Sequence, residues 1–321
     1  MDTLTLRALT PADVPALTRL YAQMEAVDQT GENYDEADVA EELADPALDL
    51  GRDTLAAVAP DGTLVGWAAA RGSGTVIDVD RVRLEGGVLP SRRGEGIGRR
   101  LLEWSAQRGT SLHEERHPDV PGEFGIWVSE KVPSLAALVR AAGFEPIRFW
   151  YGMKRDLESL PPVPPVPAGL RVSLWTPELD DAVRRAHGQA FADHWGSVPP
   201  DEQRWGQWFT GSQGFRPSIS WVVLDGEQIA AYVLSYFFEA DAAATGVREA
   251  YIGQIGTQRA WRRRGLGALL LATALARFTE EGYQRASLTV DTSNPTGALG
   301  LYERAGFAVD DKSVTWARPV G

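Results

Sequence analysis

The chain has 321 residues, 44% of them hydrophobic, and a formal net charge of −12. Because this length exceeds the usual size of one domain, two domains are expected. The acidic balance argues against nucleic acid and anionic membranes as partners, whereas a cationic amine suits it. The sequence has no cysteine and only four histidines, which excludes disulfides, thiolate chemistry and a histidine-rich metal centre, so no metal is expected.

The N-terminal residues contain no apolar signal segment, and no stretch approaches the roughly 18 apolar residues of a membrane helix. We therefore expect a cytoplasmic protein that does not bind membranes. The composition leaves the oligomeric state open between a monomer and a homodimer.

In the first half, a strand is expected at residues 4–7, followed by a helix that begins near Thr10 and Pro11. Threonine is a favourable N-cap, and proline is favourable at the first helical position. Residues 55–70 alternate around an Asp-Gly pair and predict a β-hairpin. A further strand then leads into the glycine-rich turn at residues 93–98, with the sequence Arg-Gly-Glu-Gly-Ile-Gly, and into a long helix.

A proline-rich spacer at residues 158–168 is expected to be extended and semi-rigid. It divides the chain into an N-terminal domain, residues 1–157, and a C-terminal domain, residues 169–321.

The C-terminal domain repeats the pattern of the first. A strand at residues 170–174 and a predicted hairpin at residues 221–235 precede a second glycine-rich turn, at residues 262–267, with the sequence Arg-Arg-Arg-Gly-Leu-Gly. Both halves also carry Ala-Gly-Phe, at residues 142–144 and 305–307. This repetition indicates duplicated domains. Each is predicted to be an α/β (α+β) fold, with a mixed, mostly antiparallel sheet flanked by helices.

Each glycine-rich turn lies between a strand and a helix. Free N–H groups at a helix start suit a phosphate, and glycine lets the backbone approach the anion. A dinucleotide-binding fingerprint would lie after an early strand with an acidic residue about 20 positions on, and a Walker loop would contain Gly-Lys-Ser/Thr. Neither pattern fits the two turns.

Two motifs in the C-terminal half resemble the GNAT N-acetyltransferase superfamily. Residues 262–267 match its Arg/Gln-x-x-Gly-x-Gly/Ala motif, and residues 251–257 resemble the strand before it. Residues 288–295 and 298–307 resemble the second family motif, which contains Tyr302. Because both motifs occur in the order and spacing of the family, this half is identified as a member of the superfamily, which implies a sheet that is splayed at the coenzyme site.

The resemblance implies acetyl-coenzyme A as the cofactor and direct attack of an amine on its thioester. In the family the loop holds the pyrophosphate, and the strand binds the pantetheine arm. Tyr302 would lie beside the sulfur and protonate the leaving thiolate, since tyrosine is protonated at neutral pH. The residues expected to bind the cofactor in this half are Ile255, Gly256, Thr257, Arg262, Arg263, Arg264, Gly265, Leu266, Gly267, Asn294 and Tyr302.

Glu249 is the candidate general base. Alternation along the strand places Glu249, Tyr251, Gly253, Ile255 and Thr257 on one face. Many family members have a glutamate with this role on this strand, at a position that varies. An edge carboxylate in solvent is an equally good interpretation of Glu249.

The aromatic segment around residues 191–209 is expected to shape the acceptor site. Asp193 would pair with a cationic amine, and Trp195 would enclose it by a cation–π contact, with Tyr251 lining the same channel. Ordinary packing of this segment is the alternative interpretation.

The N-terminal half matches the first motif, but its second motif is degraded. Val139 stands where the C-terminal half has Tyr302, and the counterpart of the Asn-Pro turn has no asparagine. We expect this half to be a catalytically silent copy, which either holds coenzyme A or serves as a scaffold. The residues expected to bind the cofactor there are Val88, Arg93, Gly94, Gly96, Ile97 and Gly98.

The function expected from the sequence is acetyl-coenzyme A-dependent transfer of an acetyl group to the amine of a small molecule. The tandem arrangement, with a degenerate first copy, is similar to that of mycothiol synthases, so acetyl transfer of that type is one alternative. Acetylation of a protein or peptide amine, and a coenzyme A-binding sensor without turnover, are the others.

Overall fold

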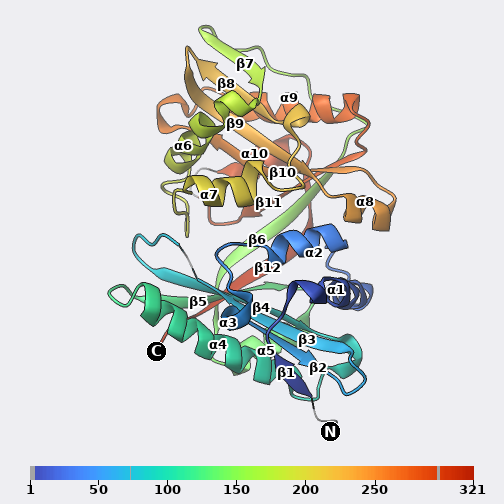
Figure 1. Cartoon of the computed structure of the whole chain (residues 1–321). Helices are drawn as coiled ribbons and strands as arrows, with labels where there is room; N and C mark the ends of the chain where they lie inside the picture. The colour runs from blue at the N-terminus through green and yellow to red at the C-terminus, as the bar shows by residue number, and fades with distance from the viewer. Residues whose placement is uncertain (1–3, 73, 295–296) are drawn as a thin grey trace. The chain divides into compact units, whose positions relative to one another are not determined.

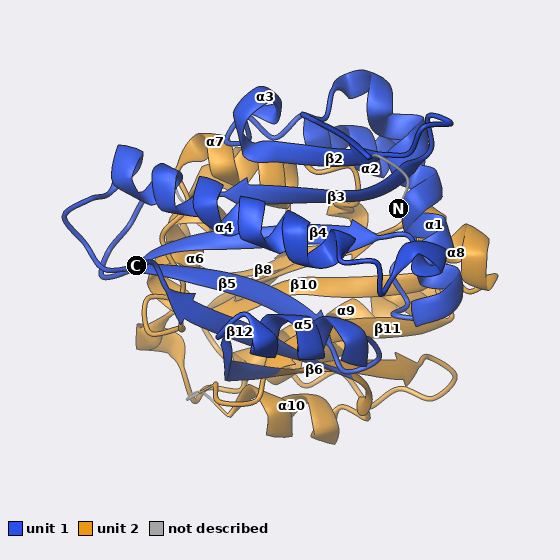
Figure 2. Ribbon diagram, turned by 90° about the horizontal axis from the view of Figure 1, so that it is seen from below, with its two compact units in different colours: residues 1–149, 312–321 blue, residues 150–311 orange. Residues whose placement is uncertain are grey.

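The structure of the chain is a computed structural model that describes residues 4–72, 74–294 and 297–321 (Figure 1). It divides into two compact units. Unit 1 comprises residues 1–149 and 312–321, and unit 2 comprises residues 150–311 (Figure 2). Pro295, which belongs to the second predicted motif, lies outside the described residues.

Unit 1 is a mixed α/β body. Its strands are β1 (Thr5–Arg7), β2 (Thr54–Val58), β3 (Leu64–Arg71), β4 (Asp80–Val88), β5 (Gly122–Ser129), the start of β6 (Glu145–Asp156) and most of β12 (Ala308–Pro319). Its helices are η1 (Pro11–Asp13), α1 (Val14–Asp28), α2 (Glu36–Leu43), α3 (Leu50–Asp53), η2 (Pro90–Arg92), α4 (Ile97–Arg116) and α5 (Pro133–Ala141).

The sheet of unit 1 has the strand order β1-β2-β3-β4-β5-β12, in which β4 and β5 are parallel and the other neighbours are antiparallel. Helices α4 and α5 bury their apolar residues against one face, and α1 and α2 bury theirs against the other. The sheet therefore lies between two helical layers, as in other α/β folds.

Unit 2 has the same architecture. Its strands are the end of β6, β7 (Leu170–Leu174), β8 (Trp221–Asp225), β9 (Gln228–Phe237), β10 (Glu249–Thr257) and β11 (Arg285–Asp291). Its helices are η3 (Pro177–Leu179), α6 (Asp180–Ala190), α7 (Glu202–Trp205), η4 (Gly206–Thr210), η5 (Pro217–Ile219), α8 (Glu239–Thr245), η6 (Arg259–Trp261), α9 (Leu266–Glu280) and α10 (Ala298–Arg304).

The sheet of unit 2 has the order β6-β11-β10-β9-β8-β7, and β10 and β11 are its parallel pair. Helices α9 and α10 pack on one face of it, and α6 and α7 pack on the other. The mixed, mostly antiparallel sheets flanked by helices confirm the fold class predicted for both halves.

The two predicted hairpins are present. Strands β2 and β3 are joined through Gly62, with φ +87°, and β8 and β9 through Gly226, with φ +59°. Both turns need the left-handed backbone that glycine adopts without strain. The local Asp-Gly signal therefore predicted both connections.

The division into compact units follows strand pairing. Residues 313–319 of β12 pair with β5 in unit 1, and residues 150–156 of β6 pair with β11 in unit 2. The contacts therefore place the unit boundaries at residues 149/150 and 311/312, away from the proline-rich spacer. The spacer itself contains no helix or strand.

Helix α9 supplies much of the core of unit 2. Leu269, Leu270, Leu275 and Phe278 are all at most 2% exposed and pack on the sheet. Burial of each such side chain contributes about 1.5–3 kcal/mol. No helix in the part of the chain that the structure describes is both long and apolar enough to cross a membrane.

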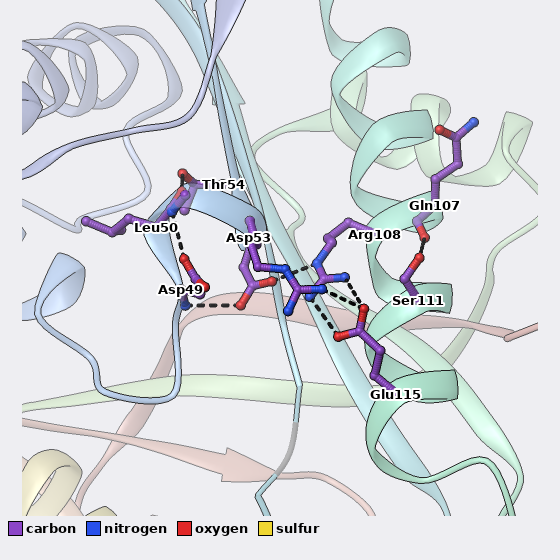
Figure 3. A network of polar contacts seen from close by, with 10 residues as sticks. Asp49, Leu50, Asp53, Thr54, Gln107, Arg108, Ser111 and Glu115 are labelled. Carbon is purple, nitrogen blue, oxygen red and sulfur yellow. Dashed lines mark hydrogen bonds and ion pairs between the residues drawn. The ribbon is translucent and has the colours of Figure 1, made fainter.

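A polar network fastens the short helix α3 to α4 in unit 1 (Figure 3). Asp53 is 1% exposed and accepts a hydrogen bond of 2.7 Å from Nε of Arg108. Glu115, two turns further along the same face of α4, pairs with both Arg108 and Arg52. Because a buried carboxylate is costly unless it is paired, Arg108 stabilises this corner of unit 1.

Candidate functional site

Each unit has a glycine-capped helix that starts shortly after a strand. In unit 2, η6 follows β10, and Gly265, with φ +78°, is the N-cap of α9. In unit 1, η2 follows β4, and Gly96, with φ +83°, is the N-cap of α4. A Cβ at either glycine would meet no described atom within 4 Å, so the backbone there is open to a ligand. The N–H groups of these helix starts suit a phosphate.

Arg263 has an unusual backbone conformation in the loop of unit 2. Its φ is +63°, and the same position in unit 1 is Gly94, with φ +81°. A non-glycine residue in this region costs roughly 1–2 kcal/mol. Arg263 and Arg264 are both exposed, so their guanidinium groups add positive charge at the start of α9.

The first arginine of each loop fastens the loop to the rest of its unit. Nε of Arg262 donates to the carbonyl oxygen of Thr257 at 3.3 Å, and another guanidinium nitrogen donates to the last carbonyl of α6. In unit 1, Nε of Arg93 donates to the carbonyl oxygen of Val88 at 3.3 Å, and its two terminal nitrogens pair with Asp28 at 2.6 Å. Both arginines were predicted to bind the cofactor, and the structure places their side chains where they position the loop.

The parallel strands of each unit separate at the end nearest this loop. In unit 2, the pairing of β10 with β11 runs from Glu249 to Ile252 of β10, although β10 continues to Thr257. In unit 1, the pairing of β4 with β5 stops at Arg83, although β4 continues to Val88. Backbone groups on the unpaired edges are available to an extended ligand.

A bulge in β10 changes which residues share a face. The register with β9 shifts between Ile252 and Gln254, so Gly253 is an extra residue. Beyond the bulge, Ile255 packs in the core cluster that also contains Ile252, while Gly256 lies against the ring of Tyr232 on the α6 side. The predicted common face of Glu249, Tyr251 and Ile255 was therefore wrong, because one inserted residue reverses the alternation.

Tyr302 lies in α10 and is 6% exposed. Burial, with a smaller contribution from Tyr251, raises the pKa of its hydroxyl well above the usual range, so the hydroxyl keeps its proton at neutral pH. The preceding residue, Leu301, would lie 3.2 Å from a Cβ at Gly267, which places α10 against the start of α9. The proton donor predicted from the sequence and the predicted anion-binding loop therefore come together in unit 2.

The equivalent helix of unit 1 has the same contact without the tyrosine. Leu138 of α5 would lie 3.3 Å from a Cβ at Gly98, as Leu301 does at Gly267. The next residue, Val139, is fully buried in the core. Its side chain has no proton to donate.

The two predicted acidic residues form ion pairs. Glu249 lies 3.5 Å from Arg285, at the end of β10 that is still paired with β11 and four residues before the bulge. Asp193 is exposed and lies 2.7 Å from Arg259 of the loop, which lowers its pKa. No group of three or more histidine or acidic side chains suited to a metal ion occurs within the described residues.

Two further predicted residues lie in segments that connect the elements of unit 2. Trp195 is half-buried in the segment after α6, and its carbonyl oxygen lies 3.2 Å from Nδ1 of His194. Asn294 lies in the turn between β11 and α10, where its N–H donates to the carbonyl oxygen of Asp291 at 3.1 Å. That turn follows the end of β11 that no longer pairs with β10 but still pairs with β6.

Tyr251 belongs to an aromatic group on the α6 side of the sheet. Its ring centroid lies 6.5 Å from that of Tyr236 and 6.0 Å from that of Phe238, which is partly exposed. These rings come from β9, its end and β10, just before the bulge. They form an aromatic wall along the part of β10 that ends at the bulge and is still paired with β11.

A buried histidine in this region was not among the sequence predictions. Nδ1 of His187, on α6, shares a hydrogen bond of 2.6 Å with the hydroxyl of Tyr232, on β9. His187 is 6% exposed, and burial, assisted by the nearby His194, lowers its pKa to about 4. The two partners are 45 positions apart in the sequence and left no local signal, although the helical spacing of Val183 and His187 is typical of a buried face.

The site combines splayed parallel strands, a glycine-capped helix and a buried tyrosine. These features are those of acyltransferases that take the acyl group from acyl-coenzyme A. A sequence profile of the Acetyltransferase (GNAT) family matches residues 180–307. A mycothiol acetyltransferase of Geodermatophilus obscurus is 30% identical and aligns over 97% of this chain and 96% of its own length.

Two solved structures have the same fold over the whole chain. A GCN5-related N-acetyltransferase from Sphaerobacter thermophilus is 26% identical, with a TM-score of 0.77, over 99% of this chain and 96% of its own. A tandem GNAT protein from the clavulanic acid biosynthesis pathway is 21% identical, with a TM-score of 0.71, over 99% of both chains. The chain belongs to the GNAT family of acetyltransferases, as a tandem member, and it is an acyl-coenzyme A-dependent N-acetyltransferase that uses acetyl-coenzyme A.

Proposed function

We propose that unit 2 transfers the acetyl group of acetyl-coenzyme A to the amine of a small molecule, and that unit 1 does not catalyse. The observation that carries this proposal is the position of Tyr302. It lies on α10, the helix that packs against the start of α9 in the same unit as the splayed strands. Acetyl-coenzyme A, when bound, supplies the thioester that the amine attacks.

The residues of unit 2 fit this cofactor. The backbone before α9 is open at Gly265, and Arg263 and Arg264 add positive charge there for the pyrophosphate. A Cβ at Gly256 would lie 2.6 Å from the ring of Tyr232, so glycine is the residue that fits between this ring and the strand. We assign the pantetheine arm to the unpaired edge at Ile255, Gly256 and Thr257, and one further contact to Asn294.

Tyr302 is the proposed proton donor. Because burial favours its neutral form, its hydroxyl holds a proton that the departing sulfur can accept. The N–H groups on the unpaired edge of β10 are suited to stabilise negative charge that develops on the acyl oxygen. These roles need neither histidine nor cysteine.

Glu249 stays a prediction as the general base. Its contact with Arg285 and its place at the paired end of β10 favour a structural ion pair. An amine that reaches the site in its neutral form needs a base only after attack, so a water molecule can accept its proton. Replacement of Glu249, described below, separates these roles.

Two features of unit 1 support its assignment as a silent copy. Val139 replaces the proton donor, and the carboxylate of Glu85, on the unpaired part of β4, lies 2.6 Å from Nε of the buried Arg71. Arg71 also contacts Glu42 and Asp45, so Glu85 is fixed in a buried charge network. We propose that the loop from Arg93 to Gly98 still holds coenzyme A through its backbone, with Val88 at the end of the strand.

The acceptor is proposed to be a small molecule that bears an amine. The aromatic wall of Tyr236, Tyr251 and Phe238 suits an apolar or cationic group near the bulge, where the open part of β10 begins. Asp193 and Trp195 are the further residues proposed to contact it. Acetyl transfer of the mycothiol acetyltransferase type is the second candidate function, because relatives of that name align over nearly the whole chain.

The test is an acetyl-transfer assay of the purified chain with acetyl-coenzyme A and a panel of small amines, read by release of free thiol. Calorimetric titration with coenzyme A is run beside it. Amine-dependent thiol release supports the proposal. Coenzyme A binding without transfer to any amine contradicts it and supports a sensor, and transfer only to peptides contradicts the small-molecule acceptor.

A further inference from the structure

The unpaired half of β10 requires support from elsewhere in unit 2. Beyond Ile252 it loses its ladder with β11 and is hydrogen-bonded to β9 on one edge alone. Such a strand edge, free on one side, is more easily displaced than a strand in the middle of a sheet. Yet this is the half that carries the proposed cofactor contacts at Ile255, Gly256 and Thr257.

The ring of Tyr232 lies over this half of the strand. Tyr232 is opposite Gly256 in the ladder, and a Cβ at Gly256 would lie 2.6 Å from its ring and 2.8 Å from its hydroxyl oxygen. The outer end of the tyrosine side chain, Cε1, Cζ and the hydroxyl oxygen, therefore fills the space that a side chain of residue 256 would occupy. The position of this ring limits how far β10 can move toward α6.

His187 fixes the far end of that ring. Its Nδ1 lies 2.6 Å from the hydroxyl of Tyr232, and both residues are buried. The imidazole is itself held by Phe191, stacked at 4.6 Å, and by Phe209, edge-on at 5.0 Å. A lowered pKa of about 4 keeps it neutral near pH 7, so it carries no charge into this apolar cluster.

Unit 1 has an aromatic residue and a glycine opposite each other at the equivalent place, but another side chain fills the space at the glycine and the hydrogen bond is missing. Trp67 lies opposite Gly87 in the ladder of β3 and β4, one residue before the end of the strand. Met24 of α1 occupies the space beside it, 2.5 Å from a Cβ at Gly87. The indole Nε1 of Trp67 is buried and has no hydrogen-bond partner among the described residues.

We propose that His187 and Tyr232 are positioning residues that hold the unpaired half of β10 in the shape required by acyl-coenzyme A. This inference rests on the proposed function of unit 2 and adds residues that do not themselves touch the reacting atoms. Under this proposal the catalytic unit differs from the silent unit in two ways. It has the tyrosine of α10, and it has the buried hydrogen bond between His187 and Tyr232.

The first measurement is hydrogen–deuterium exchange on the cofactor-free chain. Tyr232→Phe removes one oxygen, and His187→Leu removes the partner. In both variants, peptides that cover Ile252–Thr257 should exchange about 5- to 10-fold faster relative to peptides of α9, because one buried hydrogen bond is lost. The matched control is Trp67→Phe in unit 1, which should leave exchange in β10 unchanged.

The second measurement is coenzyme A affinity by calorimetry. Tyr232→Phe and His187→Leu should weaken binding to unit 2 by about 10-fold, while His187→Asn, which keeps a hydrogen-bonding atom near the Nδ1 position, should stay within about threefold of the parent. Non-additive effects in the Tyr232→Phe/His187→Leu pair are expected, because both remove the same bond.

Unchanged exchange in β10 for both variants would overturn the proposal, even if both melt at lower temperature, because packing alone would then explain the pair. The exchange experiment needs neither substrate nor turnover. A parent chain that fails to transfer acetyl groups would therefore refute the proposed function and leave this test valid. Since Tyr232→Phe keeps the ring, it remains informative if His187→Leu does not fold.

Discussion

Val139 occupies in unit 1 the helix position that Tyr302 occupies in unit 2. Each follows a leucine that packs against the last glycine of its loop, Gly98 or Gly267. The two units therefore differ at a single defined position in an otherwise matching contact. In the proposed function, this difference separates binding of the cofactor from its use.

Replacement of Tyr302 by phenylalanine should lower kcat by about 10²-fold or more, because the ring stays and only the proton donor is lost. Coenzyme A affinity should change little. Steady-state kinetics with calorimetry checks both. Tyr283→Phe, at a buried tyrosine of the same unit, is the control and should retain activity. A Tyr302→Phe enzyme with nearly full kcat would remove the tyrosine from the mechanism.

Replacement of Gly256 by alanine should abolish coenzyme A binding to unit 2 and destabilise the fold by about 1–3 kcal/mol, because the new methyl group overlaps the ring of Tyr232. Chemical denaturation and calorimetry measure the two effects. Gly125→Ala is the matched control on β5, where a Cβ would meet no described atom within 4 Å. Equal stability of the two variants would contradict the close packing of Tyr232.

Replacement of Arg263 by glycine should raise the free energy of unfolding by about 1 kcal/mol, because the residue adopts φ +63°. If backbone N–H groups carry the pyrophosphate contacts, coenzyme A affinity should fall by no more than about threefold. Denaturant titration and calorimetry test this pair of outcomes. A loss of affinity of 100-fold would instead assign the main contact to the guanidinium group.

The neutral His187 makes stability depend on pH. Burial lowers its pKa from 6.5 to about 4, and its neighbours are Tyr232, which is neutral, and His194, which opposes a second positive charge. Between pH 6.5 and 4 the unfolded chain binds a proton that the folded chain does not. The contribution of neutral His187 to stability is therefore complete above pH 6.5 and is lost as the pH falls.

In measurements, the free energy of unfolding of the parent should fall by up to about 3 kcal/mol more than that of His187→Asn between these pH values. Denaturant titrations at several pH values supply the slopes. Identical slopes for parent and variant would show that the pKa of His187 is not depressed.

Replacement of Glu249 by glutamine separates its two proposed roles. If Glu249 pairs only with Arg285, the variant should lose at most about 1 kcal/mol of stability and keep the acidic limb of its pH–rate profile. Disappearance of that limb, with a large loss of kcat at neutral pH, would identify Glu249 as the general base.

The sequence predicted those parts of the fold that local chemistry determines. The Asp-Gly hairpins and the glycine-capped helix starts follow from backbone conformations that few residues adopt, so they could be placed without any partner. The alignment of Val139 with Tyr302 followed from the repeated Ala-Gly-Phe that comes after both.

Features that depend on distant partners could not be predicted in this way. The bulge at Gly253 is defined by the register with β9, and simple alternation therefore assigned Ile255 to the wrong face. The hydrogen bond from the guanidinium of Arg262 to the carbonyl oxygen of Thr257 depends on the fold of the loop and could not be read from the motif. The bond between His187 and Tyr232 joins elements 45 residues apart.

The pairing of β12 with β5 has a consequence for the order of folding. Residues 313–319 supply the strand beside β5, yet they are synthesised after all of unit 2. During translation the edge of β5 therefore stays open until residues 313–319 have been made. An unpaired strand edge can associate with other chains, so this protein should depend on rapid completion or on a chaperone while it is being made.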